Sequence, residues 1–153
     1  MITYKKMDVT STTYGIIGHG VNCLGLMGSG VALAIRRTFS KAYQEYKQLC
    51  ENYTSTRELL GVTQIVDINP QLYIANCFTQ EYCGSDGAKY ASTSAIEESL
   101  AGLISFADIK QLPVYLPKIG AGLGGLSWKD DVLPIIESIS EDYPDVDIII
   151  CEI

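Results

Sequence analysis

The sequence predicts an α/β domain in which helices cover both faces of a mixed central sheet. Three observations lead to this fold class. Segments with strand character alternate with segments of helical periodicity along the 153 residues, a pattern typical of a mostly parallel sheet. Two strand-like segments in the middle are separated only by a short turn, which predicts one antiparallel pair. Two glycine-rich loops each follow an apolar strand and precede a helical pattern.

The first half of the chain is predicted to contain two strands and two helices. Residues 2–8 and 14–22 have strand character. Residues 29–39 have the apolar spacing of a short amphipathic helix. A second helix is expected from Ser40, a residue type that caps helix N-termini well.

The centre of the chain is predicted to form a hairpin followed by a helix. Residues 61–68 and 72–79 are strand-like, and the turn-forming segment 69–71 lies between them. The next helix is expected to begin at Ser92 or Thr93.

The last third is predicted to form a strand, a helix and a final strand. Residues 113–119 are strand-like, and the helix over 127–142 opens with a Ser-x-x-Asp pattern that resembles a capping box. Pro134 predicts a kink or a later start of this helix. Residues 146–153 are almost continuously apolar, which predicts a strand covered on both faces.

Composition favours one intracellular domain over residues 1–153. No apolar run approaches the roughly 20 residues of a membrane span, and the first ten residues lack the apolar core of a signal peptide. A cytoplasmic location is therefore expected. The formal net charge of −7 argues against strong binding to a nucleic-acid backbone.

Cysteine and histidine usage predicts neither disulfides nor a metal site. The five cysteines are odd in number and form no C-x-x-C pair, and the chain has one histidine. Reduced, mostly buried thiols are therefore expected, and neither a metal nor another cofactor is predicted.

The two glycine loops are the strongest functional signal. Gly25–Gly30 and Gly120–Gly125 together hold seven of the fourteen glycines. Backbone N–H groups at such turns, next to a helix N-terminus, can bind an anion. Two loops indicate a ligand with two linked phosphates, or one phosphate held from both sides. The alternative is that both are merely tight turns.

Four side chains near the strand ends are candidates for chemistry. His19 is expected to emerge at a strand end as a general acid or an anion donor, or else to be structural. Asn22 can bind a sugar hydroxyl or form a turn. Asp8 can accept from an exocyclic amine, although an N-cap or Asx-turn role is favoured from the residue alone. For Cys23, a packed thiol is favoured over a nucleophile.

The order of these motifs resembles the macro domain family along nearly the whole chain. The stretch from His19 to Ala32, with the pattern HxxNCxGxMGxGVA, resembles the first ligand loop of macro domains. Residues 119–128, with the pattern IGAGLGGxxW, resemble their second, phosphate-wrapping loop. Residues 7–10, Met-Asp-Val-Thr, resemble the family's Gly-Asp-Ile-Thr element with methionine in place of glycine.

The resemblance implies a three-layer α/β/α macro domain that binds ADP-ribose or a related molecule. It implies that Asp8 and Val9 hold the adenine and that Asn22 holds the distal ribose. The diphosphate and distal ribose would be held by the two loops, that is, by Gly28, Ser29, Gly30, Val31, Gly120, Ala121, Gly122, Leu123, Gly124 and Gly125.

Within the family, the chain resembles the branch of ADP-ribose-1''-phosphate phosphatases and terminal ADP-ribose glycohydrolases. The yeast phosphatase matches His19 and the Asn22-Cys23 pair, which implies catalytic roles for His19 and Asn22. The glycohydrolases use a lysine near the position of Gln80, and some use an aspartate at the position of Gly124. Neither is present here. Hydrolysis of ADP-ribose-1''-phosphate is therefore expected; the alternatives are binding without turnover and removal of ADP-ribose from a macromolecule.

A second group of residues resembles phage-type relatives assigned to the phosphatases. These residues are Thr79-Gln80, a Tyr-x-Gly pattern at 82–84, and the Gly-Leu-Gly-Gly run of the second loop. The resemblance implies a phage or bacterial source, and hence the host cytoplasm if the protein is phage-encoded. Residues 83–87 are also expected to form a flexible loop and a possible lid.

Overall fold

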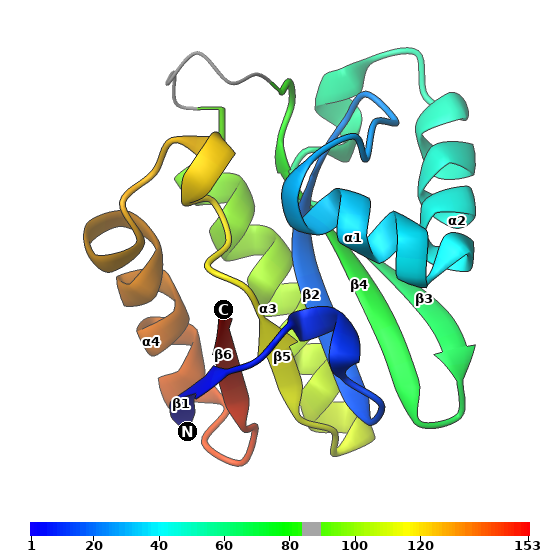
Figure 1. Cartoon of the computed structure of the whole chain (residues 1–153). Coiled ribbons are helices and arrows are strands. Elements are labelled where there is room, and N and C mark those ends of the chain that lie inside the picture. Colours follow the sequence, from blue (N-terminus) through cyan, green and yellow to red (C-terminus); the bar gives the residue numbers. More distant parts are fainter. Residues whose placement is uncertain (84–89) are drawn as a thin grey trace.

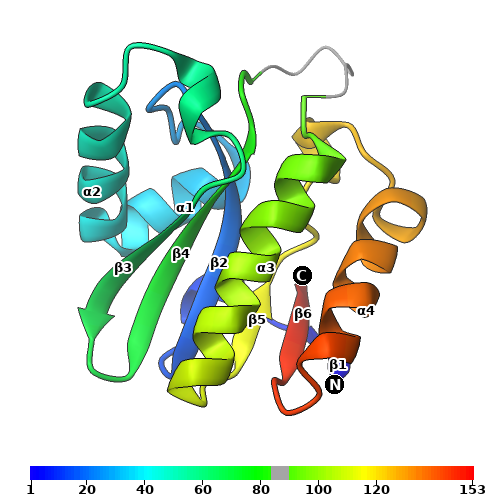
Figure 2. The same cartoon turned by 180° about the vertical axis from the view of Figure 1, so that it is seen from behind.

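The protein has three layers, with a sheet between two pairs of helices (Figures 1 and 2). The computed structural model describes residues 1–83 and 90–153. Most of the expected lid therefore lies outside the described residues. The described part contains a six-stranded sheet. Its strands are β1 (Ile2–Lys6), β2 (Gly15–Asn22), β3 (Thr63–Asn69), β4 (Leu72–Gln80), β5 (Val114–Leu116) and β6 (Ile148–Glu152).

The sheet is mixed, as the sequence predicts. Its order is β1-β6-β5-β2-β4-β3. All neighbouring pairs are parallel except β3 and β4, which form the expected antiparallel hairpin. The parallel strands therefore end at one common edge, the upper edge in Figure 1. Ligands of open α/β sheets bind beyond this carboxyl edge.

Two helices cover each face of the sheet (Figures 1 and 2). One face carries α1 and α2, and the opposite face carries α3 and α4. Their bounds are Gly30–Thr38 for α1, Ser40–Glu51 for α2, Thr93–Lys110 for α3 and Leu133–Asp142 for α4. None of the helices in residues 1–83 and 90–153 combines the length and hydrophobicity that a membrane span requires.

The helix ends correct one local prediction, confirm two and confirm another in part. Phe39, not Ser40, is the N-cap of α2, because that single residue separates α1 from α2. Ser92 does cap α3, accepting from the Ala95 N–H at 3.3 Å. Ser127 caps the next turn as predicted, because its Oγ accepts from the Asp130 N–H at 3.1 Å, but the reciprocal bond of its own N–H goes to the Asp131 Oδ2 rather than to Asp130. A five-residue π-helical turn follows, and α4 begins at Leu133, the later start that Pro134 predicts.

The apolar core is divided by the sheet. On the α3 and α4 side, Leu103 and Ile136 pack with Ile148 and Ile150 of β6. The other face of β6 is covered as well, as the sequence predicts: Cys151 is buried in the cluster on the α1 side, and the partly buried Ile149 packs against that cluster. The α1 and α2 side holds two smaller clusters. The second of these lies directly beneath the first glycine loop.

Candidate functional site

A cavity of about 680 Å³ opens at the carboxyl edge of the sheet, between the two glycine loops. This volume lies within the range of about 300–1,000 Å³ typical of small-molecule sites. The structure thus brings the two loops, about ninety residues apart in sequence, to one site. Its lining comprises Gly20, Val21, Asn22, Leu26, Gly28, Ser29, Gly30, Val31, Ala32, Thr79, Gln80, Cys83, Pro117, Lys118, Ile119, Gly120, Ala121, Gly122 and Gly124.

The side chain of Asn22 makes two hydrogen bonds that close the first loop. Asn22 ends β2 and directs its amide back into the loop that follows. Its Oδ1 accepts from the Leu24 N–H at 2.9 Å, and its Nδ2 donates to the Leu26 carbonyl at 2.8 Å. Asn22 therefore forms the turn, one of the two roles its sequence position suggests, while also lining the cavity.

The first loop delivers the N-terminus of α1 to the cavity. Ser29, Gly30, Val31 and Ala32 all line it. Gly30 has φ of +59°, a conformation that glycine adopts without strain. The first N–H groups of a helix lack intrahelical acceptors and carry the positive end of the helix dipole. This end of α1 is therefore suited to an anionic group.

The second loop is shaped by its glycines. Gly120, Gly122 and Gly125 have φ of +77°, +44° and +81°. The Leu126 N–H closes the loop on the Gly120 carbonyl at 2.9 Å. A Cβ added at Gly120 would lie 2.9 Å from the Ile96 Cδ1, whereas one at Gly122 would meet nothing within 4 Å. Packing and conformation both require glycine at 120, and conformation alone favours it at 122.

The charge of the lining suits an anion. Among the described lining residues, Lys118 is the one with a cationic side chain, and none is acidic. The Lys118 Nζ lies 2.8 Å from the Glu152 Oε2, at the ends of β5 and β6. Both side chains of this pair are about two-fifths exposed.

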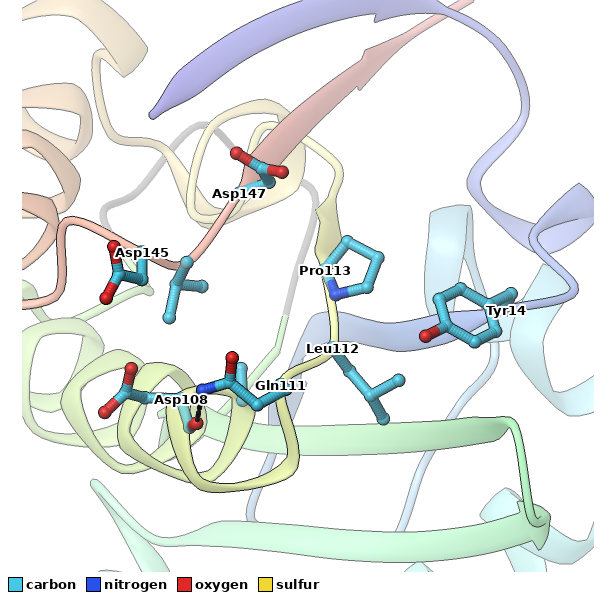
Figure 3. Close-up of a pocket in the computed structure, with 9 residues that line it drawn as sticks. Tyr14, Asp108, Gln111, Leu112, Pro113, Asp145 and Asp147 are labelled. Atoms are coloured by element: carbon cyan, nitrogen blue, oxygen red, sulfur yellow. Dashed lines mark hydrogen bonds between the residues drawn. The ribbon is translucent and has the colours of Figure 1, made fainter.

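A second cavity, of about 310 Å³, lies at the opposite edge of the sheet (Figure 3). Its lining includes Asp108 of α3 together with Asp145 and Asp147 from the connection between α4 and β6. These three carboxylates would repel a phosphate. The charge therefore distinguishes the two ends, and only the carboxyl edge suits an anionic ligand.

His19 lies inside the protein, away from the cavity. Its side chain was expected to emerge at a strand end; this is wrong, because His19 lies three residues before the end of β2 and its side chain is buried against Asn76. His19 is completely buried and does not line the cavity. Its Nε2 lies 2.7 Å from the Asn76 Oδ1. His19 therefore occupies a structural position in the core, the alternative to a general acid or an anion donor.

The bonds of Asn76 fix the tautomer of His19. Both N–H groups of Asn76 are used, because its Nδ2 donates to the Ala42 carbonyl and to the Gln64 Oε1. The Asn76 Oδ1 is therefore an acceptor, and the His19 Nε2 must carry the proton. The His19 Nδ1 is buried without a partner among the described residues. Burial accordingly lowers the pKa of His19 to about 4, so the imidazole is neutral at physiological pH.

Asp8 and Val9 lie beside the cavity rather than in its lining. Asp8 caps the 3-10 turn Val9–Ser11 by accepting from the Thr10 N–H at 2.9 Å. This bond holds the pKa of the Asp8 carboxyl below its usual value. Val9 is buried in one apolar cluster with Ile35 of α1, and Val31, which lines the cavity, packs against that cluster. The capping role of Asp8 is thus present in the structure.

Not every residue of the second loop lines the cavity. Gly120, Ala121, Gly122 and Gly124 line it, whereas Gly125, also assigned to the ligand from the sequence, does not. Leu123 belongs to the 3-10 turn Gly122–Gly124.

Sequence reasoning assigned no ligand contact to several lining residues at the ends of β4 and β5, although it noted Thr79 and Gln80 in the family resemblance. Thr79 and Gln80 end β4, and Lys118 follows β5. They could have been predicted, because the carboxyl ends of parallel strands lie at the same edge of the sheet, beside the end of the strand that carries Asn22. The Gln80 Nε2 donates to the Tyr82 carbonyl at 2.7 Å, and its Oε1 lies 3.6 Å from the place a Cβ on Gly124 would occupy. Gln80 and Gly124 therefore face each other in the cavity.

The cysteines are free thiols. Cys23 is buried in the apolar cluster that contains Met27 and Phe78, as expected for a packed thiol, and this burial raises its pKa to about 12. Cys83 is exposed and lines the cavity. Within residues 1–83 and 90–153, no group of three or more histidine, cysteine or acidic side chains is arranged to hold a metal ion.

The chain is similar to several known proteins over most of its length. A model of the macro domain family matches residues 19–135. A DNA ADP-ribosyl glycohydrolase of Mycobacterium tuberculosis is 28% identical over 98% of this chain, which spans only 42% of that protein. An ADP-ribose 1''-phosphate phosphatase of Candida albicans is 29% identical over 85% of this chain and 88% of its own length. The solved macrodomain of M. tuberculosis DarG is 28% identical, covers the whole chain and superposes with a TM-score of 0.84.

Proposed function

Because this chain belongs to the macro domain family, we propose that it binds ADP-ribose in the cavity between the glycine loops and hydrolyses ADP-ribose-1''-phosphate. One observation carries the proposal. The cavity of about 680 Å³ is lined by two glycine loops and the N-terminus of α1, has Lys118 at its edge and contains no acidic side chain among its described lining.

The diphosphate of ADP-ribose fits between the two loops. On one side it meets the free N–H groups at the start of α1. On the other it meets the backbone of Gly120–Gly124, where open space lies beside Gly122. Adenine would extend past Val31 toward Asp8, and the distal ribose toward Asn22 and Gln80.

Two considerations favour phosphate release over cleavage of a glycosidic bond. The chain matches the Candida phosphatase over most of both lengths, but spans less than half of the mycobacterial glycohydrolase. Gln80 and Gly124 face each other where the family resemblance implies a lysine and an aspartate in glycohydrolases. Neither can supply an amine or a carboxylate there.

The reaction requires water to attack phosphorus while the bond from phosphorus to the ribose 1''-oxygen breaks. Backbone N–H groups of the second loop are fixed before the reaction and can stabilise charge on the phosphoryl oxygens. Asn22 is proposed to shape the ribose end of the site. His19 is proposed to be structural, because it has no access to the cavity.

Paired turnover assays test this proposal. Phosphate release from ADP-ribose-1''-phosphate is measured beside release of ADP-ribose from ADP-ribosylated DNA and from an ADP-ribosylated protein. We expect phosphate release only, abolished by Gly28→Glu. Release of ADP-ribose without phosphate release would overturn the phosphatase proposal in favour of the second candidate, and binding without turnover would leave a binding module.

The second candidate is removal of ADP-ribose from DNA. It is favoured by the match to a DNA ADP-ribosyl glycohydrolase over 98% of this chain. The net charge of −7 means that such a substrate would be recognised through its ADP-ribose rather than through its phosphate backbone.

A further inference from the structure

We propose that Tyr46 is a positioning residue that holds the first glycine loop in the shape that receives the ligand. This inference rests on the proposed function, because it assigns the loop to ligand binding. Tyr46 lies on α2, is completely buried and is not part of the cavity lining. It acts through Asn22 and Leu26, both of which line the cavity.

The hydroxyl of Tyr46 bridges the two ends of the loop's first turn. It lies 2.8 Å from both the carbonyl oxygen and the Oδ1 of Asn22, and its single proton is shared between these two acceptors. It also accepts from the Leu26 N–H at 3.1 Å. The alternative acceptor for Leu26, the Asn22 Oδ1, is 3.4 Å away and already accepts from Leu24. Without the hydroxyl, Leu26 would therefore keep only the weaker of its two bonds.

The ring of Tyr46 is fixed by packing. Its centroid lies 5.6 Å from that of Phe78 on β4 and 6.5 Å from that of Tyr43. Met27, in the loop itself, is fully buried in the same apolar cluster. Burial raises the pKa of Tyr46 far above its usual value, so the hydroxyl keeps its proton across physiological pH.

The helix that carries Tyr46 is itself tied to the sheet. The Asn76 Nδ2 donates to the Ala42 carbonyl at 3.2 Å, and the Gln64 Nε2 donates to the Glu45 carbonyl at 3.0 Å. Both carbonyls belong to the part of α2 that immediately precedes Tyr46. Polar side chains of β3 and β4 thus set the position of α2 on the sheet, and Tyr46 transmits that position to the ligand loop.

Tyr46→Phe removes the hydroxyl and keeps the ring in its packing. The matched control is Tyr43→Phe, on the same helix, whose hydroxyl makes none of the contacts with the loop. We expect Tyr46→Phe to bind ADP-ribose about 5- to 20-fold more weakly, the loss expected for one or two hydrogen bonds that order a binding loop. Tyr43→Phe should stay within about twofold of the wild type.

The experiment combines calorimetric titration with ADP-ribose and amide hydrogen exchange at Leu26. A loss of affinity in Tyr46→Phe together with faster exchange at Leu26, neither seen in Tyr43→Phe, supports the positioning role. Wild-type affinity or unchanged Leu26 exchange in Tyr46→Phe overturns it.

Two further results keep the test decisive. If the wild type itself does not bind ADP-ribose, the proposed function fails, and Leu26 exchange alone decides whether Tyr46 orders the loop. If Tyr46→Phe does not fold, exchange in the ligand-free wild type decides: a protected Leu26 amide supports the inference, and an amide that exchanges as in an unfolded chain overturns it.

Discussion

The two glycine loops meet at one cavity but are built by opposite means. The first is held by side chains, because Asn22 and Tyr46 hydrogen-bond to its backbone and Met27 anchors it in the core. The second is held by backbone bonds, with three glycines at positive φ, a closing bond from the Leu126 N–H to the Gly120 carbonyl, and bonds from the Tyr90 and Ala91 N–H groups to the Gly124 carbonyl. The first loop should therefore be sensitive to distant side chains, and the second to its glycines.

The largest expected effect comes from blocking the cavity without straining either loop. Gly28 lines the cavity, has no positive φ and would place a Cβ in open space. Gly28→Glu should retain the fold and weaken ADP-ribose binding by more than about 100-fold, through charge repulsion and occupied volume. Gly28→Ala is the matched control and should bind nearly normally in calorimetry. Normal binding by Gly28→Glu would place the ligand elsewhere.

A glutamate at Gly122, in the second loop, should change stability as well as ligand binding. Gly122→Glu also projects into open space, but Gly122 has φ of +44°. We expect loss of binding together with a stability cost of about 1–3 kcal/mol from the strained backbone. Thermal unfolding of Gly28→Glu and Gly122→Glu side by side measures this difference. Equal stability in the two variants would show that the second loop does not depend on glycine conformation.

The next largest loss of ADP-ribose binding is expected when the Asn22 side chain, which closes the first loop, is removed. Asn22→Ala removes the bonds to Leu24 and Leu26 and leaves the Tyr46 hydroxyl without one acceptor. We expect about 10- to 50-fold weaker ADP-ribose binding and a matching loss of turnover, because roughly two hydrogen bonds that order the loop disappear. If Asn22→Ala affected turnover and left binding intact, Asn22 would be a catalytic residue rather than one that shapes the loop.

The smallest effect on binding is expected at His19, which touches neither loop. His19→Gln keeps a donor for Asn76, so affinity and turnover at neutral pH should stay within about threefold of the wild type. A fall of 100-fold or more in turnover, with binding unchanged, would restore the catalytic assignment.

His19 should instead appear in the pH dependence of stability. Its folded-state pKa of about 4 lies below the usual 6.5, so the unfolded chain binds a proton that the folded chain excludes between these pH values. Stability should therefore fall by roughly 3 kcal/mol as pH drops from about 6.5 to about 4. Urea unfolding at several pH values measures this loss, and His19→Gln should lack most of it. An unchanged acid dependence in that variant would contradict the buried neutral imidazole.

Most of the fold follows from local sequence patterns. Strand and helix periodicities, the hairpin at 69–71 and the later start of α4 at Pro134 are encoded within a few residues of where they occur. The glycine loops were likewise recognisable, because glycine adopts positive φ more readily than any other residue.

The contacts that organise the site could not be predicted in the same way. The burial of His19 depends on which side chains of neighbouring strands and helices cover its face of β2, such as Asn76 of β4. The role of Tyr46 depends on α2 packing across the first loop, from 24 residues further along the chain than Asn22. Gly28 and Gly122 look alike in sequence, yet only Gly122 has a positive φ.

The central claim is that both loops bind one ligand, and amide chemical-shift perturbation on titration with ADP-ribose tests it most directly. The account predicts that amides at Gly28–Ala32 in the first loop and at Gly120–Gly124 in the second shift together and fit one dissociation constant. Shifts confined to one loop, or shifts clustered around Asp108 and Asp145 at the opposite edge of the sheet, would contradict it.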